Sequence, residues 1–354
     1  MTERKIINKA SLDELFNKLK SGGKRIIAPQ EKNGKIIFIE VSSFWESIPS
    51  GKDIARDYIQ TTLSPKQTVF PRYEEILSYQ FENRNIKIDK ETKKPVPTVL
   101  FGVRPCDARS LSTLNAVFTW DYIDTSFTSK LENTTVISIS CSKSDEYCFC
   151  TSVGGSPGDT AGSDILLTPL DNDNFLAEII TEKGKAILLS APELFSVKDK
   201  SASGGKDAPA VEKEKYLAQV KPHFDVKELA NKLTKLFDSD IWEEQSLRCL
   251  GCGTCAFVCP ACTCFDIQDE TNGNYGKRFM CWDSCAFALF TLHTSGHNPR
   301  ETQAPRWRQR LMHKFSYQPE RLSVYGCVGC GRCSRACPAD MNLLEHLVEI
   351  MEAQ

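Results

Sequence analysis

The sequence predicts an α/β domain over residues 1–195, followed by a mainly α-helical, cysteine-rich domain over residues 226–354. Short β-like runs alternate with a helical pattern in the first part, whereas the second part holds twelve of the sixteen cysteines. Residues 197–215 are small and charged, with no apolar periodicity. We therefore expect a flexible insertion and linker over residues 196–225.

Several segments justify the α/β prediction. A helix is expected over residues 11–20, where four apolar side chains share one face and Ser11 with Glu14 fits a capping box. A second helix is expected near residues 106–117. Strands are predicted at residues 25–28, 35–41, 98–103, 135–140 and 185–189.

The composition favours metal binding over disulfides. The chain has 354 residues, 16 cysteines and a formal net charge of −2. Its start, Met1 to Lys5, is charged and not followed by an apolar leader, and no apolar run reaches the roughly 18–20 residues that cross a bilayer. We therefore expect a cytoplasmic protein with no transmembrane segment, in which cysteines bind metal.

One cysteine pattern occurs twice in the second domain. Each copy reads C-x2-C-x2-C-x3-C-P, the spacing with which bacterial ferredoxins hold 4Fe-4S clusters. Glycines in each loop allow backbone N–H groups to approach the cluster sulfurs. The first copy contains Cys249, Cys252, Cys255 and Cys259, and the second contains Cys327, Cys330, Cys333 and Cys337.

The fourth cysteine of each copy is expected to bind the cluster of the other copy, as in two-cluster ferredoxins. Zinc is the alternative, but it usually takes two separated C-x2-C pairs. With four cysteine ligands each, the clusters have no open iron, which favours electron transfer over substrate chemistry. Cluster one would take Cys249, Cys252, Cys255 and Cys337, and cluster two would take Cys327, Cys330, Cys333 and Cys259.

A long insertion, from Pro260 to Gly326, separates the two copies. A small ferredoxin joins its motifs by a short connection, whereas this insertion contains helix-like stretches at residues 284–294 and 305–315. The sequence therefore predicts a helical dicluster ferredoxin domain, with the clusters at one end of a small bundle.

Four cysteines lie in the α/β domain, at predicted strand ends and in the loop that follows. If these strand ends meet, the four thiols suffice for a third 4Fe-4S cluster or a zinc site. The alternative is that they are unpaired thiols packed as small core residues. These cysteines are Cys106, Cys141, Cys148 and Cys150.

The remaining cysteines lie in the insertion between the two motifs. A further metal site is possible there, but we favour packing as small hydrophobic residues near the clusters. They are Cys262, Cys264, Cys281 and Cys285.

A basic stretch with interleaved aromatic residues runs from Arg300 to Arg321 and superficially resembles a nucleic-acid-binding face. The pI near 6.3 favours instead a solvated or interface helix close to the anionic clusters. We therefore expect no nucleic-acid partner.

Several motifs resemble one family over nearly the whole chain. They resemble the beta, electron-transfer subunit of soluble NiFe sulfhydrogenases, and are similar to the A subunit of anaerobic sulfite reductase. Cys281 departs from the family pattern, which speaks against a four-cysteine site in the insertion. Residues 197–215 also depart from it, and we expect them to be peripheral. The motifs are Gly102-Val-Arg-Pro-Cys-Asp107, Ser140-Cys141, Asp145-Glu-Tyr-Cys-Phe-Cys150, Cys259-Pro-Ala-Cys-Thr-Cys264, Trp282-Asp-Ser-Cys285, Gly296-His-Asn-Pro299 and Cys327-Val-Gly-Cys-Gly-Arg-Cys333.

The resemblance implies that the chain relays electrons between two partners. One is a flavin-containing subunit that reacts with NAD(P)H, and the other is a catalytic subunit of the hydrogenase, sulfite reductase or heterodisulfide-reductase-like kind. The sequence contains no G-x-G-x-x-G after a predicted strand, so we assign flavin and nicotinamide to a partner. The resemblance also strengthens the case for a metal site at the four N-terminal cysteines.

Two other functions remain open. The chain could itself be a catalytic reductase subunit, with substrate meeting an additional cluster built from the extra cysteines. Alternatively, the clusters could be structural and the basic stretch could bind nucleic acid. We favour electron transfer because two cysteine-saturated clusters are predicted without any substrate or cofactor motif.

Overall fold

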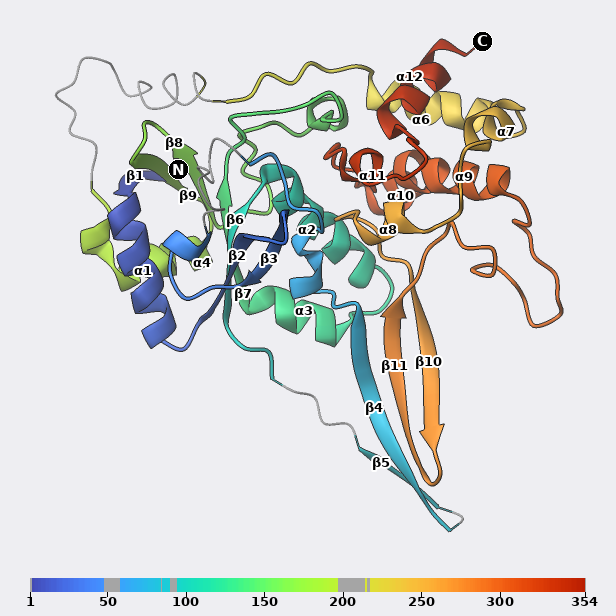
Figure 1. The fold of residues 1–354 in the computed structure, drawn as a ribbon, viewed down its shortest axis with the longest axis horizontal. Coiled ribbons are helices and arrows are strands. Elements are labelled where there is room, and N and C mark those ends of the chain that lie inside the picture. The colour runs from blue at the N-terminus through green and yellow to red at the C-terminus, as the bar shows by residue number, and fades with distance from the viewer. Residues whose placement is uncertain are drawn as a thin grey trace.

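The computed structural model describes residues 2–47, 58–83, 85–89, 94–196, 214 and 217–353. A seven-stranded sheet of order β1-β9-β8-β7-β6-β2-β3 organises the N-terminal part (Figure 1). Strands β2, β6, β7 and β8 pair in parallel, and the outer strands join them by antiparallel pairs. The strands are β1 (Glu3–Asn8), β2 (Arg25–Lys32), β3 (Lys35–Glu40), β6 (Thr98–Val103), β7 (Thr134–Ile139), β8 (Ile165–Pro169) and β9 (Asn174–Ile179).

Helices cover both faces of this sheet, because its central strands are apolar on both sides. Every residue of β6 and β7 is buried. Helices α1 (Lys9–Ser21) and α4 (Glu182–Ser190) pack with Phe101 and Ile137 on one face. Helices α2 (Pro105–Phe118) and α3 (Thr125–Glu132) pack with Leu100 and Val136 on the other. The predicted α/β domain is therefore a three-layer structure.

The expected helix over residues 11–20 is confirmed as α1, but Ser11 is not its cap. Asn8 caps it instead, because its Oδ1 accepts a hydrogen bond from the Ser11 backbone N at 2.8 Å. The strand predicted over residues 185–189 is wrong, because this segment belongs to α4. Thr181 caps α4, and a short apolar run cannot by itself distinguish a strand from a helix.

A second sheet, of order β10-β11-β4-β5, joins distant parts of the chain and projects away from the body of the molecule (Figure 1). Strands β4 (Tyr73–Glu82) and β5 (Asn85–Asp89) come from the N-terminal half. Strands β10 (Phe265–Asn272) and β11 (Tyr275–Trp282) form a hairpin in the insertion between the cysteine motifs. The prediction of a mainly helical C-terminal domain is therefore only partly correct.

The signal for this hairpin is present in the sequence. Residues 265–272 read as a strand that ends in Asn272-Gly273, a dipeptide typical of tight turns, and Gly273 has a positive φ of 61°. The apolar residues of the insertion instead suggested helices. The prediction of a helix at residues 284–294 is wrong, because this segment forms a series of turns.

The C-terminal helices pack around an apolar core that includes Leu233, Trp307, Phe315 and Leu347. The helix expected at residues 305–315 is confirmed as α9, which continues into a π-helix. The larger helical segments are α6 (Val226–Lys235), α7 (Ile241–Ser246), α9 (Gln303–Met312), the π-helix His313–Tyr317, α10 (Gln318–Leu322) and α12 (Leu343–Glu352).

The expected flexible insertion over residues 197–215 lies, apart from Glu214, outside the described residues. The chain that follows it contacts the α/β part. Ala218 donates a backbone hydrogen bond to the Cys141 carbonyl at 2.7 Å, and His223 donates one to the Ser152 hydroxyl at 2.8 Å.

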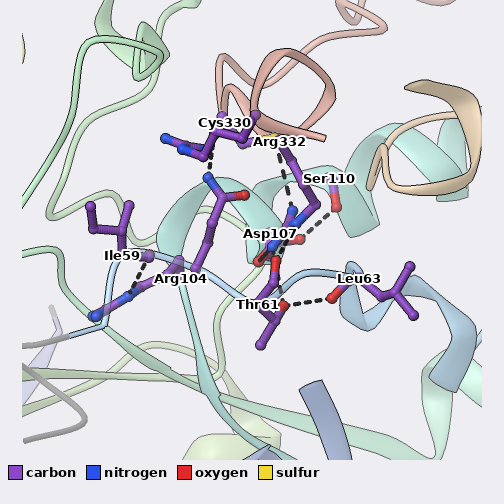
Figure 2. A network of polar contacts seen from close by, with 10 residues as sticks. Ile59, Thr61, Leu63, Arg104, Asp107, Ser110, Cys330 and Arg332 are labelled. Atoms are coloured by element: carbon purple, nitrogen blue, oxygen red, sulfur yellow. Dashed lines mark hydrogen bonds and ion pairs between the residues drawn. The ribbon is translucent and has the colours of Figure 1, made fainter. Parts of the chain in front are cut away.

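A fully buried ion pair joins the α/β part to the second cysteine motif (Figure 2). Arg332 opens the short helix α11 (Arg332–Arg335), and its Nη1 and Nη2 lie 2.7 and 2.8 Å from the two carboxylate oxygens of Asp107 in α2. The side chains are 2% and 0% exposed. Arg332 Nε also donates to the Thr61 carbonyl at 2.9 Å.

Neighbouring hydrogen bonds extend this network. Arg104 donates to the carbonyls of Ile59 at 3.1 Å and Ser140 at 2.8 Å, which holds the segment before Thr61 against the sheet. Gln60 Nε2 donates to the Cys330 carbonyl at 2.6 Å. The loop of the second motif is therefore fixed to the N-terminal part of the chain.

Breaking one side of the ion pair should destabilise the fold. Arg332→Met leaves the buried Asp107 carboxylate without its partner, so we expect the free energy of unfolding to fall by about 3–5 kcal/mol. The double variant Arg332→Met/Asp107→Leu should lose less, because no charge is left buried. Urea unfolding followed by circular dichroism under anaerobic conditions measures both.

Arg278→Met is the control for this prediction, because Arg278 pairs with Asp269 on the exposed hairpin, where both side chains contact solvent. Its unfolding midpoint should match that of the unsubstituted chain. If the unfolding midpoint of Arg332→Met also equals that of the unsubstituted chain, the buried ion pair does not stabilise the fold as predicted.

Candidate metal centres

The two copies of the cysteine pattern fold in the same way locally. In each loop two glycines adopt positive φ angles, 64° and 75° at Gly251 and Gly253, and 64° and 66° at Gly329 and Gly331. A one-turn helix follows each loop, α8 (Thr254–Phe257) after the first and α11 after the second. The repeated spacing therefore produces a repeated backbone conformation, which non-glycine residues rarely adopt.

The first cavity lies inside the first loop and has mostly apolar walls, including Trp307 and Leu343. Three cysteines of the first copy meet the last cysteine of the second copy there. Cys285 and Cys333 also contribute to the lining. The motif cysteines that line this cavity are Cys249, Cys252, Cys255, Cys333 and Cys337.

The second cavity adjoins the first, since Cys333 and Arg310 line both. Here the last cysteine of the first copy, Cys259, meets the three leading cysteines of the second copy. Lys314 and Phe149 complete the wall. The motif cysteines that line it are Cys259, Cys327, Cys330 and Cys333.

In each cavity the motif cysteines line a volume and do not converge on a single position. Within the described ranges, no group of three or more His, Cys, Asp or Glu side chains is placed to hold one metal ion. A cubane cluster instead needs thiolates around a volume, which is what the two cavities provide. The donor set of both cavities therefore fits 4Fe-4S clusters.

Buried cations give a second reason to expect anionic clusters. Arg310 and Lys314 are each 4% exposed, and Lys66 is 2% exposed. Lys314 Nζ lies 3.5 Å from Cys259 Sγ, and none of the three cations forms an ion pair with a carboxylate in the described part of the chain. A buried charge is costly unless an opposite charge compensates it, and a thiolate-bound iron–sulfur cluster carries negative charge.

The basic stretch was expected to be a solvated or interface helix close to the clusters; part of it lies beside the cysteines, but it is buried there and not solvated. Arg306 and Arg310 in α9, together with Lys314 in the π-helix, are buried. Burial by itself lowers the pKa of Lys314, but the nearby Cys259 and Cys262 sulfurs outweigh it and raise the pKa. Arg310 and Lys314 thus lie beside cysteine sulfurs, whereas Arg321 at the end of the stretch is exposed.

The four N-terminal cysteines lie at one edge of the large sheet. Cys106 sits in the first turn of α2, directly after β6, and Cys141 follows β7. Cys148 and Cys150 come from the next loop. Cys141 interacts electrostatically with Cys148 and Cys150, while Cys106 interacts with Cys141 and also with Cys330. The ends of parallel strands thus bring these thiols near one another and near the second cavity.

Burial keeps these N-terminal thiols protonated when no metal is bound. It raises the pKa of Cys141 to about 11 and that of Cys150 to about 12. Thiols with such pKa values are poor nucleophiles at neutral pH, and a metal would bind them by displacing the protons.

The loop that carries Cys148 and Cys150 packs directly on the second cysteine motif. Phe149 donates a backbone hydrogen bond to the Gly329 carbonyl at 2.9 Å. A Cβ on Gly329 would lie 2.5 Å from the Phe149 carbonyl oxygen, so only glycine permits this approach. Arg335 pairs with Asp145 and places Nη2 3.2 Å from Cys148 Sγ.

The remaining four cysteines do not form one group. Cys281 lies on β11 opposite Asp266 of β10, and its thiol interacts electrostatically with Asp266 and Asp283. Cys262, Cys264 and Cys285 lie together beside the first motif. None of the described helices is long and apolar enough to cross a membrane.

Sequence comparisons agree with these features. The model of a 4Fe-4S dicluster domain matches residues 248–341, which include both cysteine motifs. The sulfhydrogenase 2 beta subunit of Pyrococcus furiosus is 32% identical over 341 residues, which is 96% of each chain. This protein therefore belongs to the family of sulfhydrogenase beta subunits and carries two 4Fe-4S clusters in a dicluster domain.

Proposed function

We propose that this chain relays electrons between a flavin-containing subunit that reacts with NAD(P)H and a catalytic redox subunit. The catalytic partner would be a hydrogenase, a sulfite reductase or a heterodisulfide-reductase-like module. The observation that carries the proposal is the pair of adjoining cavities, each lined by motif cysteines from both copies. Clusters saturated with thiolates and placed side by side suit outer-sphere electron transfer.

In this proposal each cluster takes its fourth ligand from the other copy. Cys337 belongs to cluster one with Cys249, Cys252 and Cys255, since all four line the first cavity. Cys259 belongs to cluster two with Cys327, Cys330 and Cys333, since all four line the second. The shared wall supports close electronic contact between the two.

A third 4Fe-4S cluster at Cys106, Cys141, Cys148 and Cys150 would extend the relay into the α/β part. Its support is the packing of the Cys148 loop on the second motif, together with the interaction between Cys106 and Cys330. Such a cluster would stand next to cluster two and farther from cluster one.

The partner assignment rests on family membership. The Pyrococcus relative is named as one subunit of a sulfhydrogenase. The nucleic-acid alternative loses its main support, because Arg306, Arg310 and Lys314 of the basic stretch are buried. The alternative in which this chain is itself a catalytic reductase subunit requires a metal centre other than the two clusters, because four cysteine ligands leave those clusters no open iron.

Cysteine-to-serine variants test the crossed ligands. Cys337→Ser should shift the reduction potential and EPR signal of the same cluster as Cys252→Ser, because an oxygen ligand changes only the cluster it binds. Cys259→Ser should likewise reproduce the effect of Cys330→Ser. EPR-monitored redox titration of the four variants measures this.

The uncrossed arrangement makes the opposite prediction for the same variants. If Cys337→Ser matches Cys330→Ser and Cys259→Ser matches Cys252→Ser, each motif binds its own cluster and the proposed assignment is wrong.

Iron analysis tests the N-terminal cluster. The double variant Cys141→Ser/Cys150→Ser should contain about four fewer iron atoms per chain than the unsubstituted protein if these thiols hold a 4Fe-4S cluster. Cys281→Ser, which replaces a thiol away from the other cysteines, is the control and should retain all its iron. Equal iron in the double variant and the control would remove the third cluster from the relay.

Kinetic assays test the partner assignment. The purified chain alone should not oxidise NADH or NADPH with benzyl viologen as acceptor, because it has no flavin of its own in this proposal. Oxidation should appear when the flavin-containing subunit is added. Rapid NAD(P)H oxidation by the chain without any flavoprotein would refute the assignment.

A further inference from the structure

The sheet β10-β11-β4-β5 projects from the body of the molecule as an arm, with β5 toward its free end (Figure 1). In an antiparallel sheet, residues directly opposite each other point to the same face. Tyr79 of β4 lies opposite Ile88 of β5, and the next pair on this face is Phe81 with Ile86. Phe81, Ile86 and Ile88 are 39%, 57% and 55% exposed. One face of the arm is therefore apolar and exposed near its end.

The aromatic side chains on this face are fixed by their neighbours. The Tyr79 ring lies over Gly276 of β11, where a Cβ would clash with it. The rings of Tyr79 and Phe81 meet edge to face, with centroids 5.6 Å apart. Antiparallel sheets usually pack their apolar face on a core, and an exposed apolar patch is typical of an interaction site. The face therefore indicates contact with another protein surface.

Strand β5 is also an open edge of this sheet. It pairs with β4 and, in the described part of the chain, with no other strand. All of its residues are exposed. Alternate residues of an antiparallel pair direct their backbone N–H and C=O groups away from the partner strand, so these groups of β5 can bind an additional strand.

The charges of β5 complement a second copy of the same strand. Lys87 and Asp89 flank Ile88 and point to the other face of the sheet. When two copies of β5 pair antiparallel about Ile88, each Lys87 lies opposite an Asp89 of the other copy. A shift of two residues in either direction brings two lysines or two aspartates opposite each other instead. The charges therefore select one register.

The other open edge of the arm lacks this complementarity. Strand β10 carries Asp266, Asp269 and Glu270 but no lysine or arginine. Two copies of β10 would bring like charges together, which opposes their pairing. Between the two edges, β5 is therefore the one suited to self-association.

We propose that the arm is a dimerisation element, in which the β5 strands of two copies of this chain pair antiparallel about Ile88. Two Lys87–Asp89 pairs form across the two-fold axis on one face. On the other face, Ile86 and Ile88 of both copies join into one apolar surface. Such an interface uses the same patch on both copies and is closed by its symmetry. The residues that line the two cysteine cavities come from other elements, so the contact lies apart from the cluster sites.

Charge variants of the full chain, purified anaerobically, test the register. Lys87→Asp places carboxylates opposite each other across the axis, and Asp89→Lys does the same with ammonium groups. The dimer dissociation constant of each variant alone should rise about tenfold or more. An equimolar mixture of the two variants should dimerise again, because every pair across the axis is then opposite in charge. Sedimentation equilibrium measures the dissociation constants.

Asp266→Lys is the control, because it makes the same charge change as Asp89→Lys on the other open edge, and it should leave the dimer unchanged. Circular dichroism and iron content verify that each variant is folded. An unsubstituted chain that stays monomeric over its whole soluble concentration range would overturn the proposal. A dimer whose dissociation constant is the same in Lys87→Asp, Asp89→Lys and the control would also overturn it, because that dimer uses another surface.

Ile88→Asp tests the centre of the contact, since it places two carboxylates at the axis. It should be monomeric at concentrations at which Asp266→Lys is dimeric. If the chain alone is monomeric and Ile88→Asp instead weakens binding of the flavin-containing or the catalytic subunit, the arm is a site for that subunit and the proposed dimer is wrong.

Discussion

The buried ion pair between Arg332 and Asp107 is the contact on which the arrangement of the cysteine sites depends. Arg332 follows Gly331 in the second cluster loop, and Asp107 follows Cys106 at the start of α2. Charges taken out of water are tolerated only with good geometry, and two parallel hydrogen bonds provide it. The pair therefore fixes the second loop against the edge of the large sheet, with little freedom to slide or rotate.

Charge compensation explains the rest of the buried polar structure. Arg310 and Lys314 approach the cysteine sulfurs from one continuous helical segment, and Lys66 approaches them from the N-terminal half of the chain. In water these side chains would be strongly hydrated, so their burial makes sense only beside anions. The clusters and their cation shell thus stabilise each other: the cations lower the electrostatic cost of the clusters, and the clusters compensate the cations.

Local sequence signals predicted the fold well where they were unambiguous. The alternation of predicted strands with a predicted helix near residues 106–117, which is α2, indicated the α/β part of the fold. The spacing of cysteines and glycines indicated both cluster loops. Residues 185–189 were assigned to a strand because a four-residue apolar run has no decisive period. The hairpin of β10 and β11 was missed although Asn272-Gly273 marks its turn, and its partner strand β4 lies almost 200 residues away in the sequence.

The sequence by itself determined the chemistry of the two loops, because ten or so consecutive residues carry the ligand spacing and the glycines that the backbone requires. The crossed positions of Cys337 and Cys259 were also expected from that spacing. Only the tertiary structure decided which groups outside the motifs meet the loops: it placed Lys66 beside Cys262 and Phe149 against Gly329. These contacts depend on how helices, hairpin and sheet pack, and packing between remote segments leaves no local pattern in the sequence.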